Sequence, residues 1–553
     1  MKKVTIVGGG MAGLTAALRL QQRGFEVTLY EQDNFLGGKW GAHADEHGHT
    51  HGSRKPKAGS TKAIYHEHCY HMLLNWFNNF WRIVDELDLR DRFEPSSTLK
   101  YLRAGEFPHT TEFRDVGSPA TVLQNLFSGV LPVPDSFIYS YSLIDLVSQQ
   151  FRRGHFLDQY SVNGFMHSRP YSTDAAAIHH QRTLAKAFAS PSYLTSASTY
   201  KSFIKFGLRH PVPMMWILKG NCQEHFHEHL ERRLTNPPKD SGQHPVKINR
   251  LHQLRRIHIH EKHAVRLTFG LMEHSPTLDT FAQPTGETRV EVDGFLLVAI
   301  PSQALANMVD EALFTAAPEL GNLRKLHTEP MASVDLYFNK KLPNVPKGHV
   351  VLWKSKYDLT FIDNSQYWPD EPHTVLNVVA SDFDILDFDD VHIYDEKKAE
   401  EITDKLAYQY ILQELKRYIP FDEEKDVDWE KSHVQTNIGE TLFVNQVGSW
   451  EFRPSTETSL ENMFLAGDYC RSVIDVVTIE AATVTGLMAA EAIRSREKVG
   501  EPIEIIEPDY YPEPLMGAMK LMWAPYAYAA KLWSWAGSQG LSPLQGWPSR
   551  ERD

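Results

Sequence analysis

The first 31 residues of the chain carry the pattern of a strand, a helix and a second strand in direct succession. Residues 4–7 (VTIV) are a short run of β-branched residues, which is typical of a buried parallel strand. Residues 12–22 have apolar side chains at helical spacing, and Gly24 ends this segment. Residues 25–30 then indicate a second strand, with Glu31 at its end. This succession predicts a βαβ unit and an α/β fold.

Three glycines stand at the first turn of this unit in the order GxGxxG, as Gly8, Gly10 and Gly13. In dinucleotide-binding units the first permits a tight turn, the second lets backbone approach a pyrophosphate, and the third allows close helix–strand packing. The helix that begins near Ala12 directs its free N–H groups and its dipole at that pyrophosphate. Glu31 would accept hydrogen bonds from the ribose hydroxyls, and its charge disfavours the 2′-phosphate of NADP. The stretch predicts a site for NAD or FAD.

The size and charge of the chain restrict what else it does. At 553 residues it is long enough for two or three domains. Its net charge of −13 argues against a nucleic-acid partner, because phosphate binding needs a basic surface. Cys69, Cys222 and Cys470 have no CxxC spacing and predict neither a disulfide framework nor a zinc site. The glycine motif argues against a signal peptide, and no run of about 18 uncharged apolar residues is present, so we expect a cytoplasmic protein.

The residues after Glu31 distinguish between the two cofactors. The sequence FLGGKWG follows, with Gly37, Gly38 and Lys39 beginning six residues after the acid. This order resembles the FAD-dependent amine oxidase and phytoene desaturase superfamily, and within it the plant- and cyanobacterial-type carotenoid desaturases and the hydroxysqualene dehydroxylase-like flavoproteins. In that superfamily the GG(R/K) loop lines the far side of FAD, so the resemblance implies that these three residues contact FAD. No second GxGxxG is present, which favours one tightly bound FAD and no separate nicotinamide domain.

A second block of the resemblance lies near the C-terminus. NMFLAGDY predicts a strand that runs into Gly467 and Asp468, and a helix begins near Thr478 and Ile479. The block resembles the FLAGD segment that closes the FAD site in carotenoid desaturases. It implies that Asp468 binds the ribityl or pyrophosphate part of FAD and that the helix N-terminus faces the flavin pyrimidine, where it stabilises the negative charge of reduced flavin. Ala481 stands where the family usually has glycine.

Two further blocks resemble the same superfamily and imply how the domains alternate. Residues 293–301 (DGFLLVAIP) predict a buried strand that returns the chain to the FAD domain, and Leu254 or a neighbour would touch the adenine. Residues 331–342 alternate as a strand of the substrate domain. We expect a Rossmann-like FAD-binding domain of a two-dinucleotide-binding-domain flavoprotein, interleaved with an α+β substrate domain. The expected division is FAD-binding domain at 1–100, 246–310 and 456–500, a mainly helical substrate or lid region at 101–245, a mixed-sheet substrate domain at 311–455, and an amphipathic tail at 501–553.

The segment after the GGK loop is rich in histidine. The stretch from His43 to His51 is charged and rich in glycine, and no cysteine or carboxylate completes a ligand set, so we expect a solvated loop and no metal. Glu67 and His68 precede an aromatic-rich helix, at a place that lies against the flavin ring in the resembled family. They are candidates for a proton acceptor or substrate-orienting group, and the alternative is a polar hinge satisfied by the backbone. The same resemblance implies three residues that line the substrate cavity: Trp216, Lys219 and Asn221.

The C-terminal tail contains a segment with two unlike faces, which begins at Leu515 and ends at Gly537. Lys520 and Lys531 are eleven residues apart, which places them on one side of a helix, and most of the large aromatic and methionine side chains fall on the other. A cationic stripe opposite an aromatic face is typical of a helix in a membrane interface. The alternatives are packing on the protein's own core or on a dimer partner. Pro525 is expected to kink or split the helix.

Together these features predict an FAD-dependent oxidoreductase. The expected reaction takes a hydride from a C–H bond of a lipophilic substrate to flavin N5 and forms a double bond, as a desaturase or dehydrogenase does. With no nicotinamide domain, the electrons would pass to a quinone or to O₂. Two alternatives stay open. One is oxidation of a small or lipophilic amine-like metabolite, and the other is a flavin-dependent isomerase or dehydroxylase, or a non-catalytic flavoprotein.

Overall fold

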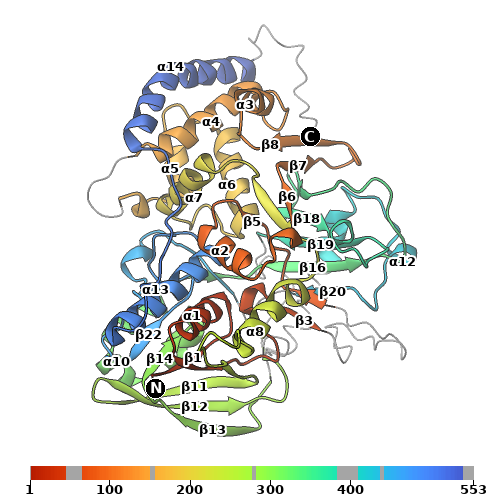
Figure 1. Cartoon of the computed structure of the whole chain (residues 1–553). Helices are drawn as coiled ribbons and strands as arrows, with labels where there is room; N and C mark the ends of the chain where they lie inside the picture. The colour runs from red at the N-terminus through yellow and green to blue at the C-terminus, as the bar shows by residue number, and fades with distance from the viewer. Residues whose placement is uncertain are drawn as a thin grey trace.

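The computed structural model describes residues 2–44, 65–149, 156–276, 282–382, 409–435 and 441–539. These residues form two large sheets and a separate layer of helices (Figure 1). A five-stranded parallel sheet has the order β10-β2-β1-β14-β22. Its strands come from distant parts of the chain: β1 (Lys3–Val7), β2 (Glu26–Tyr30), β10 (Lys247–Asn249), β14 (Phe295–Val298) and β22 (Met463–Leu465). After β2 the chain thus leaves this sheet and returns to it three times, at β10, β14 and β22, as expected for an interleaved FAD-binding domain.

Side chains that alternate along these strands give the parallel sheet two buried faces. On one face, Ile6 and Leu297 pack with helices α1 (Met11–Gln21) and α13 (Ile479–Glu497). On the other face, Val298 belongs to a core that includes a three-stranded antiparallel sheet, made of β11 (His252–His260), β12 (His263–Leu271) and β13 (Gly286–Glu291). A parallel sheet covered on both sides has near-continuous apolar strands, which is why its segments were recognisable in the sequence.

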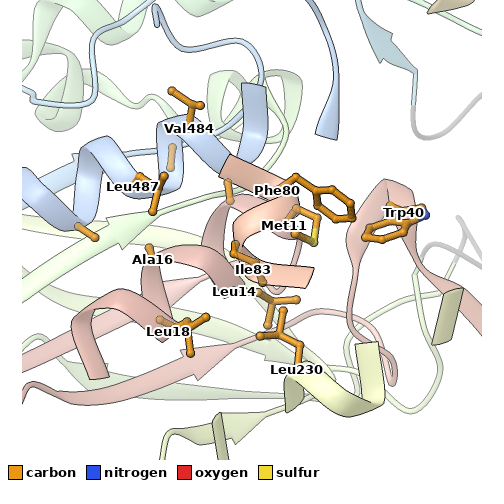
Figure 2. Close-up of a cluster of buried hydrophobic side chains, with 14 of the residues drawn as sticks. Met11, Leu14, Ala16, Leu18, Trp40, Phe80, Ile83, Leu230, Val484 and Leu487 are labelled. Carbon is orange, nitrogen blue, oxygen red and sulfur yellow. The ribbon is translucent and has the colours of Figure 1, made fainter. Parts of the chain in front are cut away.

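Figure 2 shows the core around α1, where side chains from several helices meet. Met11 of α1 lies in the same cluster as Phe80 of α2 (Asn78–Glu86) and Leu230 of α8 (Glu228–Thr235). All three side chains are buried. This packing fixes the first turn of α1, which carries the glycine motif, against the rest of the domain that contains the parallel sheet.

The second large sheet has seven strands in the order β20-β16-β19-β18-β17-β7-β8. Its neighbours run antiparallel except β17 and β7, which are parallel. The strands are β7 (Thr98–Leu102), β8 (Thr110–Arg114), β16 (Ala332–Tyr337), β17 (His349–Leu352), β18 (Leu359–Asp363), β19 (Val375–Ala380) and β20 (His433–Gln435). Strand β7 spans the expected domain boundary at residue 100, so part of the segment assigned to the FAD-binding domain pairs with the substrate domain. Smaller sheets are β3 (Ala42–Ala44) with β4 (Tyr65–Glu67), β5 (Leu73–Leu74) with β9 (Met215–Leu218) and β6 (Phe93–Ser96), and β15 (Thr328–Glu329) with β21 (Leu442–Phe443).

A layer of helices lies at the end of the molecule opposite the parallel sheet (Figure 1). It is built from α3 (Pro119–Leu126), α4 (Val133–Val147), α5 (Val162–His167), α6 (Asp174–Phe188), α7 (Ala197–Arg209) and the C-terminal α14 (Glu513–Ser538). Most of these helices come from the region 101–245, which was expected to be mainly helical. Shorter helices elsewhere are α9 (Ser302–Met308), α10 (Glu311–Ala316) and α12 (Glu423–Asp426).

Helix α14 resolves two alternatives that the sequence left open. It continues through Pro525 as one helix, so of the expected kink or split, the split does not occur. Its lysine side faces the protein: Lys520 Nζ lies 2.6 Å from the buried Asp145 carboxylate of α4, and Lys531 Nζ donates to the Pro170 carbonyl at 2.6 Å. The tail therefore packs on its own fold through its cationic face. In the described part of the chain, no helix is both long and apolar enough to cross a membrane.

Candidate functional site

A cavity of about 350 Å³ lies at the carboxyl ends of the parallel strands. In open α/β sheets this is the edge where ligands bind, because the loops there leave a crevice. The segments that follow four of the strands line it: Gly8 and Gly10 after β1, Glu31 after β2, Ala299 to Gln303 after β14, and Gly467 to Tyr469 after β22. One cavity thus gathers segments that lie hundreds of residues apart in the chain.

At two of the three motif glycines, Gly8 and Gly13, the backbone leaves no room for a side chain. A Cβ on Gly8, whose φ is +106°, would lie 2.2 Å from the Ala299 carbonyl oxygen. A Cβ on Gly13 would lie 2.0 Å from the Gly8 carbonyl oxygen. Gly13 does not line the cavity, so its contribution is to let α1 start directly behind the turn. Gly8, Gly10 and Ala12 do line the cavity, and no side chain caps the first turn of α1.

Glu31 is held at the cavity by the backbone. Its two carboxylate oxygens accept hydrogen bonds from Gly9 N at 2.5 Å and Asp33 N at 3.0 Å. The side chain is buried in the protein but lines the cavity. A carboxylate oriented by two backbone donors keeps lone pairs available for hydroxyl groups of a ligand.

The GGK loop lies directly opposite the glycine turn. Gly37 N donates to the Gly9 carbonyl at 2.9 Å, and a Cβ on Gly38 would lie 3.1 Å from Gly10 Cα. Lys39 Nζ donates to the Thr441 carbonyl at 2.7 Å, which joins this loop to the far side of the cavity. All three GGK residues line the cavity.

The segment between β22 and α13 lines the cavity together with the glycine turn and the GGK loop. Gly467, Asp468, Thr478 and Ile479 line the cavity, and so does Leu254 from the antiparallel sheet. The Thr478 hydroxyl caps α13 by accepting from Ala481 N at 3.1 Å. Two helix N-termini, those of α1 and α13, therefore face one cavity, and both favour negative charge there.

These observations meet the requirements of a dinucleotide with a flavin. The glycine turn allows backbone contact, the α1 N-terminus suits a pyrophosphate, and Glu31 suits ribose hydroxyls. A family model described as flavin-containing amine oxidoreductase matches residues 11–494 of the chain. The chain belongs to this family. It is an FAD-dependent oxidoreductase, with the Rossmann-like fold and the cofactor that the sequence predicted.

The chain is also similar in sequence or in structure to several individual flavoenzymes. The chain is 22% identical over 529 residues to zeta-carotene desaturase of Synechocystis sp., an alignment that covers 90% of this chain and 98% of that protein. It is 22% identical over 523 residues to 15-cis-phytoene desaturase of Synechococcus elongatus, with 90% and 96% covered. A putative protoporphyrinogen oxidase from Exiguobacterium sp. has a similar structure, with a TM-score of 0.57 and 16% identity over 90% of this chain and 99% of that one. A putrescine oxidase bound to putrescine has a TM-score of 0.59 at 14% identity, with 90% and 99% covered. These structural likenesses concern the fold.

The flavoenzyme's cavity extends beyond the dinucleotide segments to a second wall, which we call the sheet-side wall. It carries apolar and aromatic side chains together with a few neutral polar groups. Its members are the segment 68–72 with Leu74 and Phe77, and Met331, Thr360, Val379 and Ser381 at the seven-stranded sheet. Three acidic residues line the cavity of the described chain, Glu31, Asp33 and Asp468, and all three belong to the dinucleotide side. The sheet-side wall thus has no carboxylate among the described residues.

The segment 68–72 is fixed to the sheet by hydrogen bonds. Tyr70 N donates to Asn377 Oδ1 at 3.1 Å, and the Tyr70 hydroxyl donates to Thr360 Oγ1 at 2.5 Å. The Ser333 hydroxyl donates to the His68 carbonyl at 2.5 Å. Strands that meet this segment only in the tertiary structure therefore place it against the cavity.

His68 lines the cavity as expected, but its environment makes it a weak base. Burial, the neighbouring His71 and Lys39 hold its pKa well below the usual value. Burial likewise lowers the pKa of His71 to about 3 and raises that of the Cys69 thiol. Both imidazoles are therefore neutral hydrogen-bonding groups near pH 7. The ligand atoms of His68, Cys69 and His71 lie within 4.8 Å of one another, a spacing that a metal ion could occupy.

Glu67 does not reach the cavity. Its carboxylate accepts from Cys222 N at 2.8 Å, and burial, with Asp335 nearby, raises its pKa to about 7. Glu67 is the last residue of β4 and His68 follows it in a bend, and of the two only His68 lines the cavity. The structure separates the two residues that the sequence had paired as catalytic candidates. The expectation for the stretch from His43 to His51 falls mostly outside the described residues.

Trp216, Lys219 and Asn221 do not line the cavity. Trp216 lies in β9, where its Nε1 donates to Asn75 Oδ1 at 3.4 Å. Lys219 N donates to the Arg92 carbonyl at 2.8 Å, and Asn221 Oδ1 accepts from Glu224 N at 2.8 Å. Strand β9 is the central strand of the small sheet with β5 and β6, and this sheet reaches the cavity through Leu74 of β5.

Glu480, a buried acid that the sequence pattern did not mark as a site residue, joins two helices beside the site. Glu480, in the first turn of α13, accepts hydrogen bonds from Asn79 N at 2.9 Å, Asn79 Nδ2 at 2.8 Å and Phe80 N at 2.9 Å. Burial raises its pKa to about 7 despite these donors. The sequence shows only that Glu480 is an acid in the first turn of a helix. Its partners in α2 lie about 400 residues away, so the local sequence does not predict this contact.

Proposed function

We propose that the chain removes a hydride from a C–H bond of a lipophilic, carotenoid-like substrate, that the neighbouring carbon loses a proton to solvent or a nearby base, and that a C=C double bond forms. The observation that carries this proposal is the sheet-side wall, which offers apolar and neutral polar groups and no described carboxylate. An apolar chain gains free energy by leaving water for such a wall, at about 25 cal/mol per Å² of buried apolar surface. The named activities of zeta-carotene desaturase and 15-cis-phytoene desaturase, both similar over most of their length, agree with this substrate class.

An amine substrate is the competing proposal, supported by structural similarity to a putrescine oxidase. A protonated amine buried in a cavity needs a carboxylate or several strong acceptors to replace its hydration. The acids that line this cavity are Glu31, Asp33 and Asp468, all on the side proposed for FAD. This distribution of charge favours the lipophilic substrate.

We assign the following roles to the chain's own residues. Glu31 binds ribose hydroxyls, Gly8 and Gly10 bring backbone N–H groups to the pyrophosphate, and the start of α13 at Thr478 faces the flavin. When bound, FAD supplies the hydride acceptor. The sheet-side wall holds the substrate and excludes water, and neutral His68 orients it or accepts a hydrogen bond. The electrons then leave to a quinone or to O₂.

Anaerobic reduction of the holoenzyme's flavin tests this function. Phytoene or zeta-carotene in liposomes should bleach the flavin absorbance, and putrescine or a long-chain amine should not. Val379→Asp puts a charge on the sheet-side wall and should slow bleaching about 100-fold, the effect of roughly 3 kcal/mol of uncompensated polar burial. The matched control is Val212→Asp, at an exposed position outside the cavity, which should bleach normally. Bleaching by an amine and not by either carotene would contradict the proposal.

We also propose that the enzyme contacts a membrane peripherally through the outward face of α14. Both lysines of the segment from Leu515 to Gly537 are turned to the protein, so this face carries only uncharged residues. Leu521 and Leu532 expose 77% and 67% of their surface, and Tyr526 and Trp535 are also exposed beside them. Aromatic and aliphatic side chains in this arrangement suit the boundary of headgroups and acyl chains.

Flotation with phosphatidylcholine vesicles measures this contact. Leu521→Glu combined with Leu532→Glu should weaken binding at least about 10-fold, since two apolar side chains no longer enter the lipid. High salt should leave binding of the native chain unchanged, because the outward face has no charge to screen. Phe314→Glu, at an exposed position of α10 in the FAD-binding domain, is the control and should bind normally. Release of the native chain by salt would contradict the apolar mode of contact.

A further inference from the structure

Arg453 is a buried arginine beside the cavity that none of the proposed roles includes. Its side chain is 1% exposed. It lies just after the short turn Ser449–Glu451 and ten residues before β22. A buried guanidinium is costly unless its N–H groups are satisfied, so its partners show what the position requires.

The guanidinium binds the first part of the loop that links β22 to α13. Arg453 Nε donates to the Tyr469 carbonyl at 3.0 Å, and Nη2 donates to the carbonyls of Asp468 at 3.2 Å and Cys470 at 2.8 Å. Three consecutive carbonyl oxygens therefore accept from one side chain. Asp468 and Tyr469 both line the cavity.

The same guanidinium also binds the second part of that loop. Arg453 Nη1 forms an ion pair with Asp475, whose side chain is nearly buried. Asp475 also accepts from Asn445 Nδ2 at 3.1 Å. Asn445 Oδ1 in turn accepts from Val477 N at 3.1 Å, and Val477 lines the cavity next to Thr478. Arg453, Asp475 and Asn445, which we call the Arg453 network, thus hold both ends of the loop.

The Arg453 network also reaches the helical layer. The Thr199 hydroxyl of α7 donates to Asp475 Oδ2 at 3.3 Å. Ser196 N, at the start of the same helix, donates to the Asn445 carbonyl at 2.8 Å. The loop at the FAD site is therefore hydrogen-bonded, through two buried side chains, to a helix of the substrate region.

We infer that Arg453 and Asp475 are positioning residues that hold the loop 467–478 in its FAD-binding conformation and couple it to α7. The planar fork of arginine matches this role because its donors point in fixed, divergent directions toward several acceptors. A lysine has one compact ammonium group and does not reach three carbonyls and a carboxylate from one position. The inference concerns FAD retention, so it holds or fails independently of the substrate proposed above.

The test measures FAD affinity and protein stability separately in Arg453→Lys, Arg453→Met and Asp475→Asn. Each variant is stripped of FAD, its unfolding by urea is followed, and FAD is titrated back by fluorescence. Arg453→Lys and Arg453→Met should bind FAD about 100-fold more weakly, the loss of charge-assisted hydrogen bonds that order the loop. Asp475→Asn should show a smaller loss in the same direction, because the carbonyl contacts of Arg453 remain.

Arg19→Met is the matched control. Arg19 is also a buried arginine of the FAD-binding domain, paired with Glu86, and it lies outside the cavity. Its replacement should lower stability without changing FAD affinity. Thr199→Val keeps the loop's own contacts and should weaken FAD binding several-fold, which keeps the test decisive where an Arg453 variant does not fold. The inference is overturned if Arg453→Lys binds FAD like the native chain, if FAD affinity falls equally in Arg19→Met, or if Thr199→Val has native affinity.

Discussion

Replacing Gly13 by alanine should give a protein that is purified without FAD. A Cβ at this position would lie 2.0 Å from the Gly8 carbonyl oxygen, a distance at which something must move. The obstructing atom belongs to the backbone of the glycine turn, so no side-chain rotation relieves the contact. We expect the free energy of unfolding to fall by about 1–3 kcal/mol, the usual cost of overpacking, and flavin content to drop below about one tenth of native.

Gly207→Ala provides the control for this variant. Gly207 lies within helix α7, and a Cβ there meets no atom within 4 Å. Alanine at such a site should be neutral or stabilise the helix by up to about 1 kcal/mol. The measurements are flavin absorbance per chain after gel filtration and unfolding in urea. A Gly13→Ala variant that retains a full complement of flavin would show that the turn does not form the FAD site.

Replacing Glu31 by glutamine should weaken FAD binding about 100-fold, because a charge-assisted hydrogen bond is worth roughly 1.5–3 kcal/mol. The two oxygens of Glu31 each accept from a backbone donor, Gly9 N and Asp33 N. Glutamine has the same shape, but its NH₂ group would face one of those donors instead of accepting from it. The site loses both the oriented acceptor for the ribose and the negative charge.

Asp363→Asn is the control for the glutamine variant, since it makes the same carboxylate-to-amide change at another buried position. Asp363 ends strand β18, accepts from Ser365 N at 3.1 Å and does not line the cavity. Equilibrium dialysis of FAD against the stripped proteins compares the two variants. Equal affinities for Glu31→Gln and the native chain would remove Glu31 from the FAD site.

The dinucleotide side of the cavity was predictable from the sequence because its determinants are local. The turn at Gly8, the helix behind it and Glu31 lie within one βαβ unit, where spacing along the chain sets spacing in space. The GGK loop and Gly467 with Asp468 follow strands that the apolar pattern also revealed. FAD and the fold class are therefore confirmed from short stretches that each carry their own signal.

The sheet-side wall was not predictable in the same way. Thr360 and Val379 face the cavity only because β18 and β19 pair in the seven-stranded sheet and Tyr70 is bonded to that sheet. Nothing in the local sequence of these strands marks which of their residues meets a ligand. The same reason explains why Trp216, expected at the cavity, lies instead in a separate small sheet.

Helix α14 shows what the sequence predicts about an element and what only the tertiary structure decides. Its periodicity predicted a lysine side, because 3.6 residues per turn fixes relative angles around one helix. In the structure this side faces the protein, where Lys520 pairs with the buried Asp145 of α4 and where Met519 and Trp523, expected on the other side, also pack against the core. The sequence by itself thus determined the cofactor, the fold class and the apolar pattern of the FAD-domain strands, and the tertiary structure alone decided which faces meet, because that depends on partners far away in the chain.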